Sequence, residues 1–319
     1  MHAHLAGSVR RKTLQDLLEQ KGLNLDYSCF EAKDMHETFQ IFDLIYKGLT
    51  TLQDIKRVTK EMLEDFQQEN TIYLEIRSTP KQTEFYNQDE YLTTIFEEIH
   101  NFDQQFSQNM IVRFILSIDR SKDVQEAWNR LNLYKKFKKN EKYSKYLVGL
   151  DWCGNPHKNH FSQFLPVFQQ TKQENIPITI HTGEVQGVID ETQMILDFKP
   201  DRLGHFNLYN KEQFEQVLKE KIPIEMCPTS NKYTLYLDSY KDHHFSDFYK
   251  QKHTMSFNTD DNCCFNTNIT NEYEQMVNAF DLQKNDLYTI LMNSVDMIFD
   301  KQHQQVLREK IDLYFKTDN

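Results

Sequence analysis

Histidines and carboxylates lie at the ends of several short β-rich runs. These residues are His2, His4, His181, Glu184, His205, Asp260 and Asp261. His2 and His4 are two residues apart, so on a strand their side chains point to the same face. Three imidazoles and a carboxylate from such a set suit zinc and leave one position open for water. A metal site explains all these strand ends together, whereas a structural interpretation must explain each one separately.

The spacing excludes two other kinds of zinc enzyme. The sequence contains no His-Glu-x-x-His, so the helical metalloprotease site is absent. It also lacks the His-x-Glu and Pro-Cys-x-x-Cys pair of the deaminases that act on bases in nucleic acids. The segment Cys227-Pro-Thr-Ser-Asn does not replace that pair.

Eight short β-rich runs are expected to position these side chains. They are residues 1–5, 72–76, 111–118, 147–151, 177–181, 202–206, 222–227 and 255–259. Segments with apolar residues every three or four positions lie between them, at 52–66, 91–106, 124–137, 161–173 and 214–218. Strands that alternate with helices favour a parallel sheet. We therefore predict an α/β fold, a (β/α)8 TIM barrel whose metal site lies at the C-terminal ends of the strands.

The rest of the chain is expected to complete one domain. Three further helical patterns, at 273–280, 286–299 and 306–315, would close the barrel. No linker rich in Pro, Gly or Ser divides the chain, so we predict a single domain over residues 1–319. Only Met1 precedes His2, and we expect the first strand to be cut short.

The composition favours a globular protein that acts on small molecules. Lys and Arg number 37 against 48 Asp and Glu, and the net charge of −11 disfavours nucleic acids and anionic membrane surfaces as partners. No apolar run approaches the ~18 residues of a membrane span. The five cysteines form no Cys-x-x-Cys pair, which favours reduced thiols. We expect a cytoplasmic monomer without a nucleic-acid or membrane partner.

Seven segments resemble the adenosine/AMP deaminase family, in the family's order. They are Met1-His-Ala-His-Leu-Ala-Gly-Ser, Tyr73-Leu-Glu-Ile-Arg-Ser-Thr-Pro, Gly149-Leu-Asp-Trp-Cys-Gly-Asn-Pro, His181-Thr-Gly-Glu, Arg202-Leu-Gly-His, Cys227-Pro-Thr-Ser-Asn and Thr259-Asp-Asp. Four more are most similar to the adenosine deaminase-like branch, which removes the substituted 6-amino group of N6-methyl-AMP. These are Arg77-Ser-Thr-Pro-Lys, Glu191-Thr-Gln, Pro200-Asp-Arg and Ser239-Tyr-x-x-His-His-Phe.

The resemblance implies a role for each of the polar residues. One zinc ion per chain would be held by His2, His4, His181 and Asp260, and it would activate a water molecule for attack on carbon six of the purine. Glu184 would give a proton to the neighbouring ring nitrogen, for which it must itself be protonated. His205 and Asp261 would orient the attacking oxygen and stabilise the developing charge.

The resemblance also implies the contacts to a small-molecule purine nucleotide or nucleoside. They are His4, Tyr46, Ser78, Thr79, Pro80, Lys81, Asp119, Gly154 and Asp261. Hydroxyl groups and a cation at a strand end would form a phosphate cradle. The sequence departs from the family at Ala6, where the family has Asp or Asn, at Tyr46, where the branch has His, and at Lys81, where the branch has Arg.

Three functions therefore remain open on the sequence. The first is hydrolysis of N6-methyl-AMP to IMP and methylamine. The second is hydrolysis of adenosine to inosine and ammonia, because His181-Thr-Gly-Glu is closer to the nucleoside enzymes. The third is a non-catalytic barrel that binds purines, although such a protein has no physical need to keep Glu184, His205 and Asp261 together.

Overall fold

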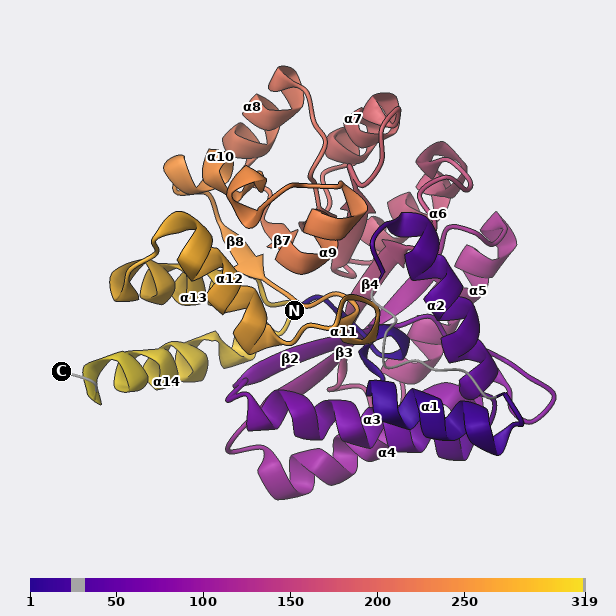
Figure 1. Ribbon diagram of the computed structural model, residues 1–319. Coiled ribbons are helices and arrows are strands. Elements are labelled where there is room, and N and C mark those ends of the chain that lie inside the picture. The colour runs from indigo at the N-terminus through magenta and orange to yellow at the C-terminus, as the bar shows by residue number, and fades with distance from the viewer. Residues whose placement is uncertain (24–31, 318–319) are drawn as a thin grey trace.

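Eight parallel strands form a closed barrel in the computed structural model, which describes residues 1–23 and 32–317 (Figure 1). Neighbours in the sheet follow the order of the chain from β1 to β8. The strands are β1 (Ala3–His4), β2 (Tyr73–Ser78), β3 (Ile111–Asp119), β4 (Leu147–Cys153), β5 (Ile178–Thr182), β6 (Arg202–His205), β7 (Ile224–Met226) and β8 (Met255–Phe257). A parallel bridge between Ala3 and Asp260 joins the last strand to the first. The predicted (β/α)8 barrel is confirmed.

The helices of the chain lie mostly around the outside of this barrel (Figure 1). They are α1 (Arg11–Gln20), α2 (Met35–Gly48), α3 (Leu52–Gln68), α4 (Gln88–Phe106), α5 (Val124–Lys138), α6 (Phe161–Gln173), α7 (Ile189–Phe198), α8 (Lys211–Glu220), α9 (Pro228–Thr234), α10 (Phe245–Lys250), α11 (Asn262–Phe265), α12 (Ile269–Phe280), α13 (Lys284–Met297) and α14 (Gln304–Thr317). Three short 3-10 turns cover Ala6–Ser8, Tyr240–Asp242 and Lys301–His303. No helix in the described ranges is long and apolar enough to cross a membrane.

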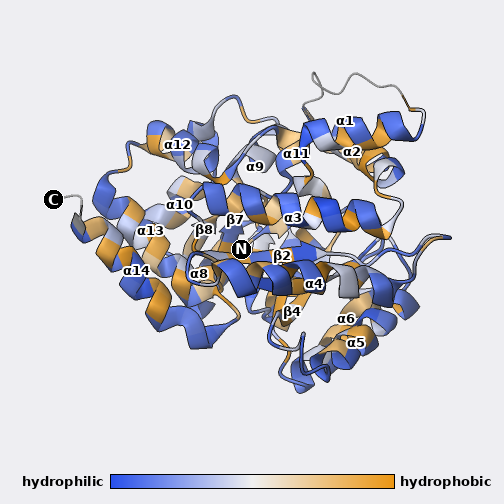
Figure 2. Cartoon of the chain, turned by 90° about the horizontal axis from the view of Figure 1, so that it is seen from below, coloured by the Kyte–Doolittle hydropathy of each residue, from blue (hydrophilic) through white to orange (hydrophobic). Residues whose placement is uncertain are grey.

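Helix α3 shows how the sequence dictates these elements. Thr51 accepts the backbone N–H of Asp54, whose carboxylate accepts the N–H of Thr51, and this capping box starts the helix. Ile55, Val58 and Met62 then recur at helical spacing and are buried against the barrel. Figure 2 shows the same division on the outer helices, with hydrophilic and hydrophobic stripes side by side.

The first β-strand is short but is held on both sides. The N–H of His4 donates to the carbonyl of Asp260 at 3.0 Å, and the N–H of Asp260 donates to the carbonyl of His2 at 3.0 Å. On the other side, β1 pairs with β2, with His4 opposite Arg77. These bonds place the side chains of His2 and His4 next to the end of β8.

The interior of the barrel carries charged side chains that are fully buried. Arg77 donates to Glu225 at 2.9 Å and lies 3.3 Å from Asp151, so it joins two carboxylates. Arg202 lies 2.7 Å from both Glu225 and Glu75. Because an unpaired buried charge is very unfavourable, these residues stabilise the barrel only as a connected set.

The four cysteines in the described ranges, Cys153, Cys227, Cys263 and Cys264, are buried and form no disulfide. Cys29 lies outside the described residues. Every described thiol is therefore part of the packed interior rather than of a surface framework.

Candidate active site and metal centre

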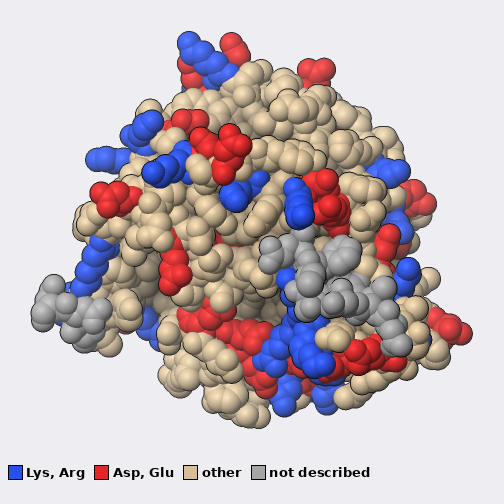
Figure 3. Space-filling view, in the orientation of Figure 1, with Lys and Arg blue, Asp and Glu red and all other residues tan. Residues whose placement is uncertain are grey.

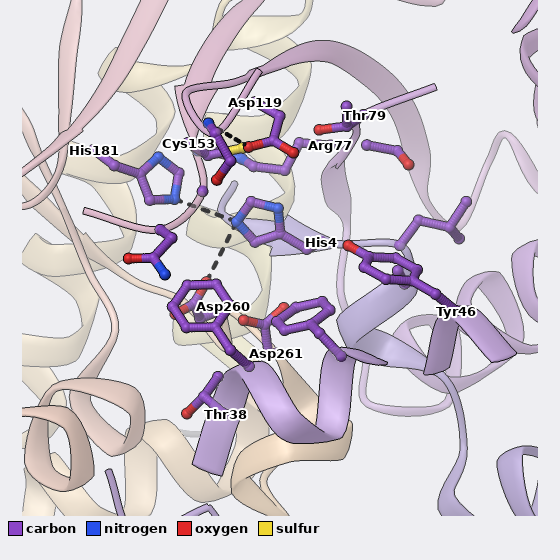
Figure 4. Close-up of a pocket in the computed structure, with 18 of the residues that line it drawn as sticks. His4, Thr38, Tyr46, Arg77, Thr79, Asp119, Cys153, His181, Asp260 and Asp261 are labelled. Carbon is purple, nitrogen blue, oxygen red and sulfur yellow. Dashed lines mark hydrogen bonds and ion pairs between the residues drawn. The ribbon is translucent and has the colours of Figure 1, made fainter. Parts of the chain in front are cut away.

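Four side chains from three parts of the barrel converge on one point. Ligand atoms of His2, His4, His181 and Asp260 all lie within 4.8 Å of one another. The Nε2 atom of His4 is 3.3 Å from the Nε2 atoms of His2 and His181, and 3.4 Å from Asp260 Oδ1. Figure 4 shows His4 joined by dashed lines to His181 and to Asp260. Ligands at ~2.0–2.1 Å from a tetrahedral ion are roughly 3.3 Å apart, so the spacing fits a metal ion.

Buried carboxylates orient two of these imidazoles. The Nδ1 atom of His2 is 2.8 Å from Glu225, and the Nδ1 atom of His181 is 3.1 Å from Asp151. A proton held on Nδ1 by a carboxylate leaves the Nε2 lone pair free for a metal, which is the usual arrangement around ligating histidines. Arg77 contacts both carboxylates, so one guanidinium supports the orientation of both rings.

Burial and neighbouring charges shift the pKa values of the cluster in different directions. Burial lowers the pKa of His4 to about 3, which keeps its imidazole neutral. Burial also acts to lower the pKa of His181, but Asp151 outweighs it and raises the value to about 9. Asp260 stays ionised because His2 and His205, among its neighbours, offset the cost of its burial. At neutral pH these shifts correspond to a neutral His4, a protonated His181 and an ionised Asp260 around a single point.

Glu184, His205 and Asp261 surround the same cluster. The Nε2 atom of His205 lies 3.7 Å from Glu184 and 3.9 Å from Asp260. Burial raises the pKa of Glu184 to about 7. Burial, with the charges of Asp260 and Glu184, also raises the pKa of Asp261 well above its ordinary range. Two carboxyl groups beside the cluster can therefore hold a proton near neutral pH.

Backbone strain and a glycine support this arrangement. His205 and Asp260 have φ values of 61° and 58°, in the left-handed region that L residues rarely adopt. Gly7 lies so close to Asp261 that a Cβ atom at this position would be 1.7 Å from Asp261 Oδ1. Only a glycine in the segment after β1 leaves room for the Asp261 side chain.

A cavity of about 490 Å³ opens over the cluster. Figure 3 shows a hollow near the middle of this face of the molecule. The lining includes most of the residues predicted from the sequence, namely His4, Tyr46, Ser78, Thr79, Lys81, Asp119, Gly154, His181, Glu184, His205, Asp260 and Asp261. The size is in the ordinary range for small-molecule sites, roughly 300–1,000 Å³.

Two predicted residues do not line the cavity. His2 is fully buried and contacts the cluster and Glu225 instead. Pro80 is buried, and its carbonyl accepts a hydrogen bond from Arg130 at 3.0 Å. Pro80 is not among the residues that line the cavity, so its predicted substrate contact stays a prediction.

The part of the cavity that carries Lys81 combines a cation, hydroxyl groups and an aromatic ring. The ammonium of Lys81 lies 4.1 Å from the centre of the Tyr46 ring, a cation–π contact. Ser78 and Thr79 follow on the same strand end, and Ser78 bonds the hydroxyl of Tyr91 at 2.8 Å. Gly154, with φ of 105°, approaches Asp119 so closely that a Cβ atom would be 2.5 Å from its carboxylate.

Sequence reasoning missed several residues of the site. Helix α2 brings Phe39 and Phe42 to the cavity together with Tyr46, but its apolar spacing was not singled out. Glu225 and Asp151 stand in apolar strands, where a carboxylate needs a buried partner, and this signal could have identified them. Lys122 also lines the cavity from the loop after β3.

Comparisons with known proteins show the family to which the chain belongs. The adenosine deaminase family model matches residues 1–314. An N6-mAMP deaminase of Arabidopsis thaliana is 32% identical over 338 aligned residues, which cover 96% of this chain and 94% of the relative. An N6-methyl-AMP deaminase of Danio rerio is 31% identical, with 94% of this chain and 89% of the relative covered.

A solved structure extends the likeness to three dimensions. The crystal structure of an Arabidopsis ADAL protein complexed with IMP superimposes with a TM-score of 0.91 at 33% identity, covering 99% of this chain and 96% of that one. The family model, the sequence identity to the relatives and the likeness in fold each extend over nearly the whole chain and indicate the same family. The chain belongs to the adenosine deaminase family and is a hydrolytic deaminase.

Proposed function

We propose that the protein hydrolyses N6-methyl-AMP to IMP and methylamine, with one zinc ion bound by His2, His4, His181 and Asp260. One observation carries the proposal: this cluster, a carboxyl group with a pKa of about 7 and a cation with neighbouring hydroxyl groups all face one cavity. The first two suit attack on a purine ring, and the third suits a monophosphate. The relatives named above and the IMP complex support the same substrate class.

The residues of the cluster fit zinc better than a harder cation. Three imidazoles and one carboxylate are donors that zinc prefers, whereas magnesium and calcium prefer oxygen ligands. When bound, the ion supplies an activated water near neutral pH. The carboxylates of Glu225 and Asp151 hold the His2 and His181 rings in the orientation that such binding needs.

The protein's own groups would manage the protons. Glu184, with its pKa of about 7, holds a proton at neutral pH and gives it to the ring nitrogen beside carbon six. Asp261 has a raised pKa, and its Oδ1 atom is buried without a hydrogen-bond partner among the described residues. In its ionised form, which the raised pKa makes a stronger base, it would accept a proton from the attacking oxygen. His205 would orient that oxygen from the other side.

The substrate's phosphate would bind where Ser78, Thr79 and Lys81 line the cavity. Burial lowers the pKa of Lys81, but the carboxylate of Asp119 acts in the opposite direction and favours the charged amine. A charge-assisted bond from this amine to phosphate contributes about 1.5–3 kcal/mol. The aromatic rings of α2 would cover the purine end.

A second candidate is hydrolysis of adenosine. The specific observation in its favour is that the ammonium of Lys81 already has a partner in the ring of Tyr46, where the branch has His. This contact competes with a contact from Lys81 to a phosphate, which adenosine lacks. Ala6, which also lines the cavity, offers no polar group to sugar or phosphate.

We also propose that residues 1–319 act as one domain in the cytoplasm. The four described cysteines are buried and unbridged, which is usual for proteins of a reducing compartment. Size measurement in solution and imaging of the tagged protein in cells test the monomeric state and the compartment.

Zinc-loaded protein incubated in parallel with N6-methyl-AMP, AMP and adenosine tests the substrate. We expect turnover of N6-methyl-AMP at the highest kcat/KM. Turnover of adenosine at an equal or higher kcat/KM favours the second candidate, and no turnover of any purine by protein with bound zinc refutes both.

A further inference from the structure

The ring of His205 is the end of a chain of hydrogen bonds that begins at a backbone group outside the cavity. The chain runs from the N–H of Phe245 through His243 and Asn231 to His205, with Asn231 and His243 both about 1% exposed. Neither Asn231 nor His243 has a part in the function proposed above. We propose that these two are positioning residues, which fix His205 in the tautomer that carries its proton on Nε2.

The first bond sets the direction of the whole chain. The backbone N–H of Phe245 donates to Nδ1 of His243 at 3.0 Å, and a backbone N–H can only donate. Nδ1 of His243 therefore carries no proton. Burial also lowers the pKa of His243 well below its ordinary value, so the ring is neutral and its proton is on Nε2.

The amide of Asn231 accepts a hydrogen bond from His243 on one side and donates one to His205 on the other. Nε2 of His243 lies 3.1 Å from Oδ1 of Asn231 and must donate to it. The amide then turns its Nδ2 group to His205, where it donates to Nδ1 at 3.0 Å. The opposite orientation of the amide would bring two N–H groups together at His243, so a backbone donor determines which way Asn231 lies.

The consequence for His205 is a fixed role. Because its Nδ1 atom accepts a bond, the ring carries its proton on Nε2, which points toward Glu184 and Asp260 at 3.7 and 3.9 Å. From there it donates a hydrogen bond to the attacking oxygen and cannot take a proton at Nε2. The acceptor of that proton is then Asp261, in line with the proposed function on which this inference rests.

The neighbouring histidine holds the backbone of the same residue. Nε2 of His244 donates to the carbonyl of His205 at 3.2 Å, and His205 is the residue whose backbone has the unusual positive φ of 61°. His243 and His244 thus both act on His205, one through the ring and one through the main chain.

Two-bond ¹H–¹⁵N spectra of the zinc-loaded, [¹⁵N]histidine-labelled protein test the tautomer directly. The signals of His205 are assigned by their loss in His205→Gln. We expect an unprotonated, hydrogen-bonded Nδ1 and a protonated Nε2. A protonated Nδ1 in the wild-type protein overturns the proposal. This measurement needs no substrate, so its result stands even if no purine is turned over and the proposed function fails.

Variants test the consequence for catalysis. Asn231→Asp presents only acceptors to Nδ1 of His205, so we expect the tautomer of His205 to reverse and kcat to fall about 100-fold. For His243→Phe we expect kcat to fall about 10-fold. Losses of this size are usual when a residue that orients a metal ligand is replaced. KM and zinc content should be unchanged. His243→Gln keeps an N–H at the Nε2 position and should recover part of kcat.

His253→Phe is the matched control. His253 is a buried histidine near the same helix, α10, and it donates to the carbonyl of Ile222 at 2.8 Å, far from His205 in the hydrogen-bond network. It should lose stability but keep kcat. If kcat falls as much in His253→Phe as in His243→Phe, or if Asn231→Asp keeps the wild-type kcat, the proposed positioning role is wrong.

Discussion

Glu184→Gln is expected to make the protein more stable and much less active, with a stability gain that depends on pH. Burial raises the pKa of Glu184 from 4.5 to about 7, and the side chain is only 11% exposed. Below pH 4.5 the carboxyl group is protonated in both the folded and the unfolded chain. Between pH 4.5 and 7 the unfolded chain loses the proton while the folded chain keeps it, so the free energy of unfolding decreases as pH rises.

The size of the effect follows from the two pKa values. At about 1.4 kcal/mol for each tenfold change in acidity, the difference between 4.5 and about 7 costs the folded protein about 3 kcal/mol above pH 7. Glutamine has no proton to lose, so the variant avoids this cost. Its advantage over the wild type should be below about 1 kcal/mol at pH 5 and largest at pH 8.

Urea unfolding of metal-free protein between pH 5 and pH 8 measures this gain. Metal-free protein is used because a bound cation would lower the pKa of a nearby carboxyl group. Glu215→Gln, on the exposed face of α8, controls for the substitution itself. With zinc bound, Glu184→Gln should lose about 10²–10⁴-fold in kcat as its proton donor is removed. Parallel stability curves for the variant and the wild type over this pH range would refute the reasoning.

Three further variants probe other parts of the site. Lys81→Ala should raise KM for a purine monophosphate about 10–100-fold and leave that for adenosine unchanged, as steady-state kinetics can show; equal losses would exclude a phosphate cradle. Gly7→Ala should lower kcat at least about 10-fold, because the new Cβ atom would lie 1.7 Å from Asp261 Oδ1 and must displace it; unchanged kcat would mean that Asp261 is not needed where it lies. Asp151→Asn should weaken zinc binding about 10–100-fold in competition with a chelator, and an unchanged affinity would show that His181 needs no carboxylate partner.

The barrel could be predicted from the sequence because its strands are short apolar runs between regular helical patterns. The prediction of residues 161–173 as a helix agrees with α6, and the strand at 111–118 differs from β3 by one residue. Helices α1, α2 and α7 were not predicted, although the buried residues of α1 and α2 recur at helical spacing. Local patterns indicate where a strand begins but not which helix will lie over the barrel.

The residues of the site could be predicted where the residue type itself indicates the chemistry. They could not be predicted where the role of a residue depends on which neighbours the fold brings to it. His2, His4, His181 and Asp260 could be proposed from their types and the family resemblance, and the structure brings them together. The partners behind them, such as Asn231, could not be assigned, because an asparagine in a helix has many roles until its neighbours are known. Pro80 shows the reverse case, a motif position that is not among the residues lining the cavity.

The central claim, hydrolytic removal of the 6-substituent of a purine monophosphate, is most directly tested by product analysis in ¹⁸O-labelled water. Zinc-loaded protein and N6-methyl-AMP should give IMP with one ¹⁸O atom at carbon six, together with an equal amount of methylamine. Unlabelled IMP, or intact N6-methyl-AMP in the presence of protein with bound zinc, would contradict the account.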